Sequence, residues 1–433
     1  MSYESSPIRD PASSGRASLY LVWLGVFAGL YGLLLAVGLV GNGFKLASGG
    51  DETARQLFAF ATNPIAGLLV GIMATALVQS SSTVTAIIVG LVAYGTLDVQ
   101  MAVPMILGAN LGTTVTNTII CMAYLNRKTE FRRAFAAATV HDAFNLLAIA
   151  IFLPLELLTG FMRHSAGWTA ELLGGASGGK FPNPISMATK PVERLFYGGE
   201  GSGLLGGLPN LWAGIILAVL GLVLIIGSIT VIGKLLKRVL QGRAERLFHA
   251  AVGRGPVAGI ISGTVVTVMV QSSTTTTSLI VPMAGAGVIK LEKVFPFTVG
   301  ANIGTCVTAL LASMAGGSNP ALSQAALQIA LVHLYFNLTA TLVIMGIPWL
   351  RRIPLWTAGM LADLGVRSRS LAIVYVLGLY FGLPILVLFL SHLMGAETLE
   401  VETPGPAAIE LIESEVSPVP PAHPAPDPAA SEE

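Results

Sequence analysis

Long apolar runs separated by short polar segments dominate the chain. The runs at 19–41, 211–233 and 371–393 are each long enough to cross the hydrocarbon layer of a bilayer, which takes about 20 apolar residues in a helix. Two further runs, 135–160 and 325–350, are apolar but contain His and Asn. The pattern predicts an all-α polytopic membrane protein.

Composition supports this fold class and excludes others. Hydrophobic residues make up 53% of the 433 residues and charged residues only 11%, whereas about a quarter of the residues in an ordinary soluble domain are charged. The net charge of +1 gives no sign of a nucleic-acid partner, and we expect none. Cys121 and Cys306 lie in apolar stretches, so neither a disulfide framework nor a metal cluster is predicted.

The chain repeats itself at a spacing of 192 residues. Positions 67–146 share 29 identities over 80 positions with 259–338. The shift aligns Gln79, Ser80, Ser81, Ser82 and Thr83 with Gln271, Ser272, Ser273, Thr274 and Thr275. It also aligns Asn110 and Thr113 of the motif Gly-Ala-Asn-x-Gly-Thr with Asn302 and Thr305, and His141 with His333. Such a duplication indicates two related structural units.

Loop charges indicate that the two units have opposite orientations. Basic residues gather on the cytoplasmic side of short loops. The stretch 126–133 has four basic residues and its counterpart 318–325 has none, whereas 234–254 has six and 42–62 has two. We therefore predict inverted-topology repeats, with the N-terminus inside and the connector 161–209 outside.

These observations divide the chain into six segments. They are a polar N-terminal segment at 1–17, repeat 1 at 18–160, the external connector at 161–209, repeat 2 at 210–352, an amphipathic segment with the last membrane helix at 353–394, and a disordered acidic tail rich in Pro and Ala at 395–433. We place the tail outside.

Each Gln-Ser-Ser cluster predicts a broken helix in a re-entrant helical hairpin. The apolar stretches before the clusters, 64–78 and 256–270, are short for a full crossing. Irregular backbone at this depth is tolerated only when it is buried in protein or lines a watery cavity. Free N–H groups at the start of the returning half-helix favour an anion, whereas freed carbonyls with Gln and Asn oxygens suit sodium.

A purely structural reading competes with this one. Ser and Thr in membrane helices commonly bond to the preceding turn or join neighbouring helices, and Gly-Ala-Asn-x-Gly-Thr can serve close packing. The duplication of the polar clusters favours a binding role over this alternative. We interpret His141 and His333 as structural, and Asp142 either as a functional acid inside the membrane or as an interfacial anchor beside Arg132.

The duplicated motifs resemble those of the type II sodium-dependent phosphate cotransporters. The stretch from Glu130 to Asp142 is similar to that family in the same place, and the resemblance covers about 18–352. It implies sodium-coupled import of inorganic phosphate by alternating access in a lipid bilayer. It also implies no enzymatic activity and no cofactor, with sodium ions as co-substrate.

The resemblance implies which residues bind the two ligands. For phosphate they are Ser80, Ser81, Ser82, Ser272, Ser273 and Thr274, and for sodium they are Gln79, Thr83, Gln271 and Thr275. The residues themselves add Asn110, Thr113, Asn302 and Thr305 as sodium ligands, because their motif is duplicated at a fixed distance from the glutamines and Asn oxygens suit sodium. Few basic residues accompany these motifs, so we expect sodium to supply part of the charge balance. The connector lacks cysteine and the C-terminal part is short, which fits a bacterial member in the inner membrane.

Two alternatives remain open at this point. A sodium-coupled carrier of another oxyanion or of a dicarboxylate would use similar hairpins. A membrane-embedded enzyme would need a nucleophile with a base, or paired carboxylates, and Asp142 stands without an evident acidic partner.

The inverted arrangement predicts where single cysteines can be labelled. Cysteines placed at Ser177 and Gln241 should react with a membrane-impermeant thiol reagent from opposite sides, the first from outside, because the connector and the basic stretch face different compartments. Labelling of both from one side would reject the inverted topology.

Overall fold

The computed structural model describes residues 16–50, 53, 58–176, 184–198, 202–251, 254–315 and 319–393. The predicted tail 395–433, most of the N-terminal segment 1–17 and the labelling position Ser177 lie outside the described residues. Residues up to Leu390 form one compact unit, which the following paragraphs describe.

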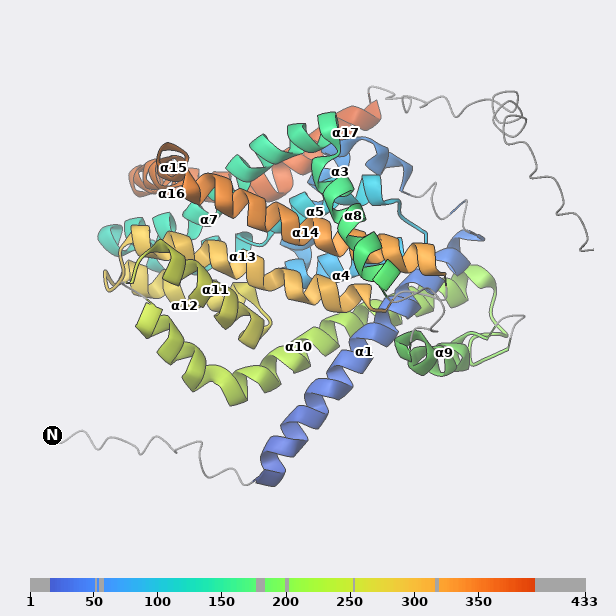
Figure 1. Cartoon of the computed structure of the whole chain (residues 1–433). Helices are drawn as coiled ribbons and strands as arrows, with labels where there is room; N and C mark the ends of the chain where they lie inside the picture. The colour runs from blue at the N-terminus through green and yellow to red at the C-terminus, as the bar shows by residue number, and fades with distance from the viewer. Residues whose placement is uncertain are drawn as a thin grey trace, which may run out of the picture. The chain divides into compact units, whose positions relative to one another are not determined.

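Helices make up almost all of the described secondary structure (Figure 1), which also contains an isolated β-bridge between Gly198 and Ser202. The α-helices are α1 Arg16–Ser48, α3 Pro64–Val78, α4 Ser81–Ala93, α5 Val99–Gly112, α6 Val115–Cys121, α7 Lys128–Thr159, α8 Phe161–Ala176, α9 Pro184–Phe196, α10 Asn210–Ala251, α11 Pro256–Val270, α12 Ser273–Gly285, α13 Leu291–Ser313, α14 Pro320–Gly346, α15 Pro348–Arg367, α16 Arg369–Leu377 and α17 Leu383–Leu393. A π-helix, η5 Gly378–Gly382, joins the last two, and short 3₁₀ turns lie at η2 Ala59–Thr62 and η3 Met122–Tyr124.

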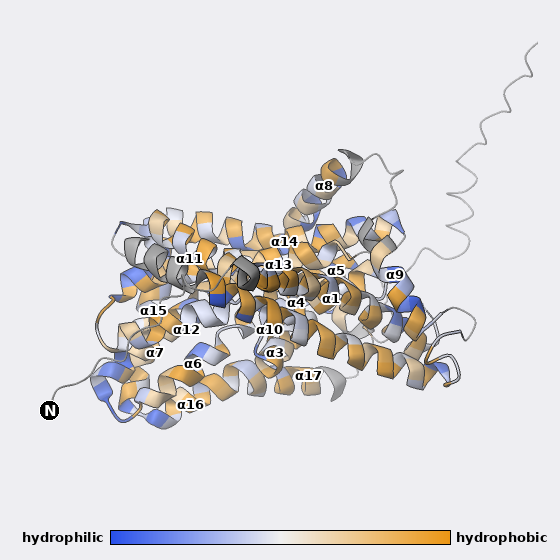
Figure 2. Cartoon of the chain, turned by 90° about the horizontal axis from the view of Figure 1, so that it is seen from below, coloured by the Kyte–Doolittle hydropathy of each residue, from blue (hydrophilic) through white to orange (hydrophobic). Residues whose placement is uncertain are grey.

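The chain is an all-α polytopic membrane protein, as the apolar pattern predicts. Within the described residues, seven helical stretches are long and apolar enough to cross a membrane. They are Tyr20–Ser48, Val99–Tyr124, Lys128–Thr159, Asn210–Val239, Leu291–Ser313, Pro320–Gly346 and Arg369–Leu390. Figure 2 shows hydrophobic residues along these helices and hydrophilic residues gathered toward their ends.

The 192-residue repeat reappears in the helix bounds. Pro64–Val78 becomes Pro256–Val270 under this shift, and Ser81–Ala93 becomes Ser273–Gly285. The next helix differs between the copies, because α13 is continuous whereas its counterpart is divided into α5 and α6 at Thr113 and Thr114. The broken helices expected from sequence are therefore present in the hairpins, with a further break in the first copy.

Glycines let the entering half-helices lie against their neighbours without a gap. A Cβ at Gly71 would lie 2.1 Å from the Met105 carbonyl oxygen, and one at Gly263 would lie 2.0 Å from the Phe297 carbonyl oxygen. These contacts join α3 to α5 and α11 to α13, in equivalent places of the two repeats. Small residues at such crossings are typical of helix packing in membranes.

Several helices extend beyond the apolar runs that predicted them. The basic stretch 234–254 belongs mostly to α10, a helix of 42 residues that ends at Ala251. Similarly, α14 already begins at Pro320, within the stretch taken as a loop. The sequence boundary of repeat 2 at 352 falls inside α15, which follows α14 after one residue. Charged residues end an apolar run without ending a helix, because Lys and Arg have good helix propensity.

Candidate functional site

The first polar cluster interrupts the helical hairpin inside the bundle. α3 ends at Val78, and Gln79 adopts a left-handed backbone conformation with φ 55° and ψ 27°. Ser80 is extended and caps α4, because its Oγ accepts a hydrogen bond from the Thr83 amide at 3.3 Å. A non-glycine residue in the left-handed region costs roughly 1–2 kcal/mol, and strain of this kind clusters at functional sites.

The second polar cluster has the same geometry. Gln271 is left-handed with φ 54° and ψ 29°, and Ser272 Oγ accepts from the Thr275 amide at 3.1 Å. In each copy the N–H groups in the first turn of the returning helix have no intrahelical acceptor. Both breaks therefore present free donors and the positive end of a helix dipole, which together favour an anion.

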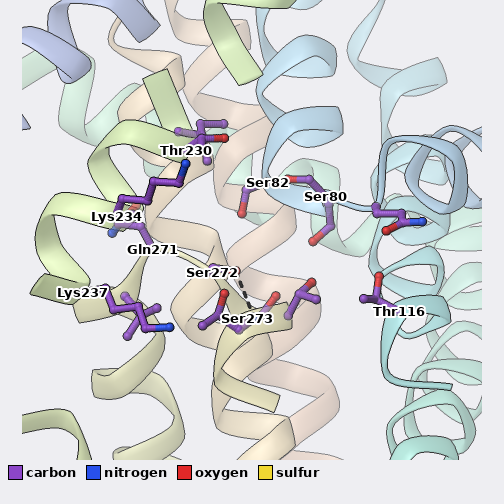
Figure 3. A pocket seen from close by; sticks show the side chains of 16 residues that line it. Ser80, Ser82, Thr116, Thr230, Lys234, Lys237, Gln271, Ser272 and Ser273 are labelled. Atoms are coloured by element: carbon purple, nitrogen blue, oxygen red, sulfur yellow. Dashed lines mark hydrogen bonds between the residues drawn. The ribbon is translucent and has the colours of Figure 1, made fainter. Parts of the chain in front are cut away.

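The two breaks face a common cavity of about 420 Å³. Its wall contains all six residues expected to bind phosphate and three of those expected to bind sodium. They are Ser80, Ser81, Ser82, Ser272, Ser273 and Thr274 for phosphate, and Gln79, Gln271 and Thr275 for sodium. Figure 3 shows Ser80 and Ser82 on one side of the cavity and Ser272 and Ser273 on the other.

The cavity wall also contains residues that sequence reasoning missed. Lys234 and Lys237 of α10 line it, which corrects the expectation of few basic residues near the site. Thr116 of α6 lines it as well, and its Oγ1 is buried without a hydrogen-bond partner in the described part of the chain. The repeat contained a signal for Thr116, because the 192-residue shift aligns it with Thr308.

The glutamine of the second break is held by its surroundings. Thr308 Oγ1 donates to Gln271 Oε1 at 3.1 Å, and Gln271 Nε2 donates to the Val268 carbonyl at 2.8 Å. Gln271 thus joins α11 to α13 beside the cavity. A side chain fixed in this way presents its carbonyl oxygen at a defined place, as an oxygen ligand of a hard cation requires.

Asn110 lies in a buried network away from the described cavity wall. Its Nδ2 donates to Asn337 Oδ1 at 2.9 Å, and its Oδ1 is 3.3 Å from His333 Nε2. All three side chains are fully or almost fully buried. The asparagine joins α5 of the first repeat to α14 of the second, which is the bridging role that Asn commonly has between membrane helices.

The second copy of this network makes the reciprocal contacts. Asn302 Nδ2 donates to Asn145 Oδ1 at 2.9 Å, and Asn302 Oδ1 is 2.6 Å from His141 Nε2. Each asparagine of the Gly-Ala-Asn motif therefore reaches the His-and-Asn helix of the other repeat. Contacts in which residue i meets j and j meets i are the signature of a two-fold relationship. The histidines have a structural role here, as expected from sequence.

The remaining residues expected to bind sodium bond locally. Thr113 Oγ1 donates to the Ala109 carbonyl at 3.2 Å, and Thr305 Oγ1 donates to the Ala301 carbonyl at 3.0 Å. Thr83 Oγ1 donates to Ser80 Oγ at 2.9 Å. None of the three belongs to the described wall of the cavity.

Asp142 is an acid within the bundle and not an interfacial anchor. It is fully buried in α7, and the Tyr375 hydroxyl of α16 donates to its Oδ2 at 2.9 Å. Arg132, the expected neighbour of an anchor, instead pairs with Asp363 of α15. Nearby in the sequence, the hydroxyl of Thr114 is hydrogen-bonded to the hydroxyl of Tyr380, which joins the break between α5 and α6 to the π-helix η5.

Comparison with known proteins shows which protein family the chain is similar to. A family model described as Na+/Pi-cotransporter matches residues 33–172 and 224–350. The chain is 32% identical to the sodium-dependent phosphate transport protein 2A of Rattus norvegicus, over 88% of this chain and 70% of that protein. It is 30% identical to the sodium-dependent phosphate transport protein 2B of Homo sapiens, over 84% of this chain and 64% of that protein. No solved structure matches the chain.

The reciprocal network generates a prediction about stability. Asn302→Leu should lower the melting temperature of the purified protein, because it leaves the side-chain oxygen of Asn145 and the Nε2 atom of His141 without their partner. Each buried polar group left unpaired costs about 1–3 kcal/mol. The matched control is Thr305→Val on the same helix, which removes a hydroxyl that donates locally to the Ala301 carbonyl at 3.0 Å. Equal melting temperatures for the two variants would contradict a structural role for the network.

Proposed function

The chain belongs to the Na+/Pi-cotransporter family, and we propose from this premise that its two Gln-Ser-Ser breaks together form the site for phosphate and sodium. As a member of this family it is a sodium-coupled phosphate transporter and not an enzyme. The observation that carries the proposal is that two breaks far apart in sequence line one cavity.

Phosphate is assigned to the serine-rich faces of the two returning helices. Ser81 and Ser273 occupy the first position of α4 and α12, where backbone N–H groups are free and the helix dipole is positive. Ser80, Ser82, Ser272 and Thr274 complete the hydroxyl groups of this assignment. Hydroxyl and amide donors can replace part of the hydration shell of an anion without a buried metal.

Sodium is assigned first to the oxygens of Gln79, Gln271 and Thr275, which share the cavity with the serines. The left-handed glutamines end the entering half-helices, whose last carbonyls have no intrahelical donor. Oxygen ligands of this kind suit a hard cation. Sodium bound there lies next to phosphate and offsets its charge, which makes the binding of the two ligands cooperative.

Sodium also supports import against the membrane potential. Moving one negative charge into a negative cell costs about 2.3 kcal/mol per 100 mV. Sodium ions that travel with phosphate cancel this cost and add the free energy of their own gradient. We assign the cycle to alternating access between inverted repeats, with a cytoplasmic N-terminus, in the inner membrane of a bacterium.

The first test of this function is uptake into vesicles that contain the purified protein. Labelled phosphate should accumulate with an inward sodium gradient and rise steeply with external sodium. Replacing sodium by potassium at matched voltage and pH should abolish uptake, because potassium does not supply the coupled gradient. Equal uptake in potassium would refute sodium coupling, and stronger competition by sulfate or succinate than by unlabelled phosphate would refute phosphate as the substrate.

The second test addresses the hydroxyl groups. Ser81→Ala and Ser273→Ala should each weaken phosphate affinity roughly ten- to a hundredfold, because a hydrogen bond to a charged group is worth about 1.5–3 kcal/mol. Transport at matched expression gives the measurement.

Ser278→Ala is the matched control for this test. Ser278 lies on the same helix as Ser273, but its hydroxyl donates to the Thr275 carbonyl at 2.9 Å and it is outside the described cavity wall. Even hydrogen bonds between membrane helices contribute only about 0.6 kcal/mol on average, so we expect the loss of this local bond within one helix to have a small effect. If the Ser81 and Ser273 variants transported as well as this control, phosphate would not bind at these hydroxyls.

A further inference from the structure

The α10 side of the cavity is electrically different from the rest of its wall. Lys234 and Lys237 lie three residues apart on this helix, so both side chains emerge on one face. The other described lining residues are uncharged, and no acid is among them. The described wall therefore combines neutral donors on two helix ends with two ammonium groups on a third helix.

We propose that Lys234 and Lys237 are positioning residues for phosphate. Their positive charges hold the ion against the serine-rich N-terminal ends of α4 and α12. This inference rests on the proposed function of the cavity and assigns a further contact within it. Two helix ends supply only about half a positive charge each, or about one in total, which leaves the dianionic form of phosphate with about one negative charge before sodium is counted. A lysine ammonium is a compact charge with three donors and is well suited to phosphate oxygens.

The position of α10 brings the Lys237 ammonium group toward the second break, whereas the Lys234 side chain extends toward Thr230 (Figure 3). Figure 3 shows the Lys237 side chain directed toward Ser272 and Ser273. A Cβ at Gly233, the residue before Lys234, would lie 3.3 Å from the carbonyl oxygen of Val270, where α11 ends. Close backbone packing thus fixes the lysine-bearing turn of α10 beside the entrance to the Gln271 break.

At the equivalent positions the first repeat has one cationic residue where the second repeat has two. The 192-residue shift places Asn42 and Lys45 of α1 opposite Lys234 and Lys237. Asn42 Nδ2 donates to the Glu193 carboxylate of α9 at 3.4 Å, so this end of α1 meets an acid. The pair Lys234 and Lys237 is therefore a feature of the second repeat, and its charge acts on the side of the cavity that α10 borders.

Binding of inorganic phosphate to the purified full-length chain at saturating sodium tests this proposal. Lys237→Gln and Lys234→Gln should each raise the dissociation constant for phosphate roughly three- to tenfold, as expected for a charge contact partly screened by water. Lys237→Arg should recover most of the affinity, because it restores the charge. The double variant should also lose affinity less steeply with added inert salt than the unaltered protein, since fewer charges are left to screen.

Arg238→Gln is the matched control. It removes a positive charge from the adjacent, exposed position of the same helix, which is outside the described cavity wall. Its phosphate affinity should stay within about twofold of the unaltered protein, because a charge that does not line the described cavity wall is largely screened from the ion by water and salt. Affinities of the Lys234 and Lys237 variants equal to that of this control would overturn the proposal.

Sodium binding measured without phosphate separates a direct role from a structural one. The lysine variants should bind sodium as tightly as the unaltered protein or more tightly, because they lack a nearby positive charge. An equal loss of sodium and phosphate affinity would indicate damage to the fold and would overturn the positioning role. Failure of the unaltered protein to bind phosphate would instead refute the proposed function, so the two failures are distinguishable.

Discussion

A helix that ends inside an apolar bundle leaves backbone amides without hydrogen-bond partners. The geometry of both breaks and the cavity between them depend on how these amides are satisfied. Both breaks meet this need in the same way, with a left-handed glutamine followed by a serine whose hydroxyl caps the returning helix. Capping satisfies part of the first turn and leaves other donors free. Those donors need water or an anion, so the free amides by themselves require a cavity between the breaks, where we propose that phosphate binds.

Close packing around the breaks makes the strained backbone possible. The entering half-helices are pressed onto α5 and α13 through glycines at which a methyl group would overlap a carbonyl oxygen. The reciprocal asparagine and histidine contacts then join the two repeats in the interior.

Under the proposed function, positive charge in the cavity has two different sources, one mobile and one fixed. Sodium would enter with its gradient and leave with the phosphate, so it would offset the charge of the anion only when both are bound. The lysines of α10 belong to the protein and line the cavity without any ligand. The same basic stretch also indicated the cytoplasmic side in the loop-charge argument. One set of residues therefore bears on both orientation in the membrane and the field inside the cavity.

Periodicity, duplication and motif spacing determined the fold class, the helix bounds of the hairpins and the residues of both Gln-Ser-Ser clusters. These features depend on local backbone chemistry and on a repeat that can be read from the sequence alone. Tertiary structure decided which clusters meet. It placed Asn110 and Asn302 in a packing network and moved Lys234 and Lys237 from a presumed loop into the cavity wall. Sequence could not separate these outcomes, since a Gly-Ala-Asn motif fits a binding site and a helix crossing equally well. The direction in which an asparagine or a lysine points depends on contacts between helices that are more than a hundred residues apart.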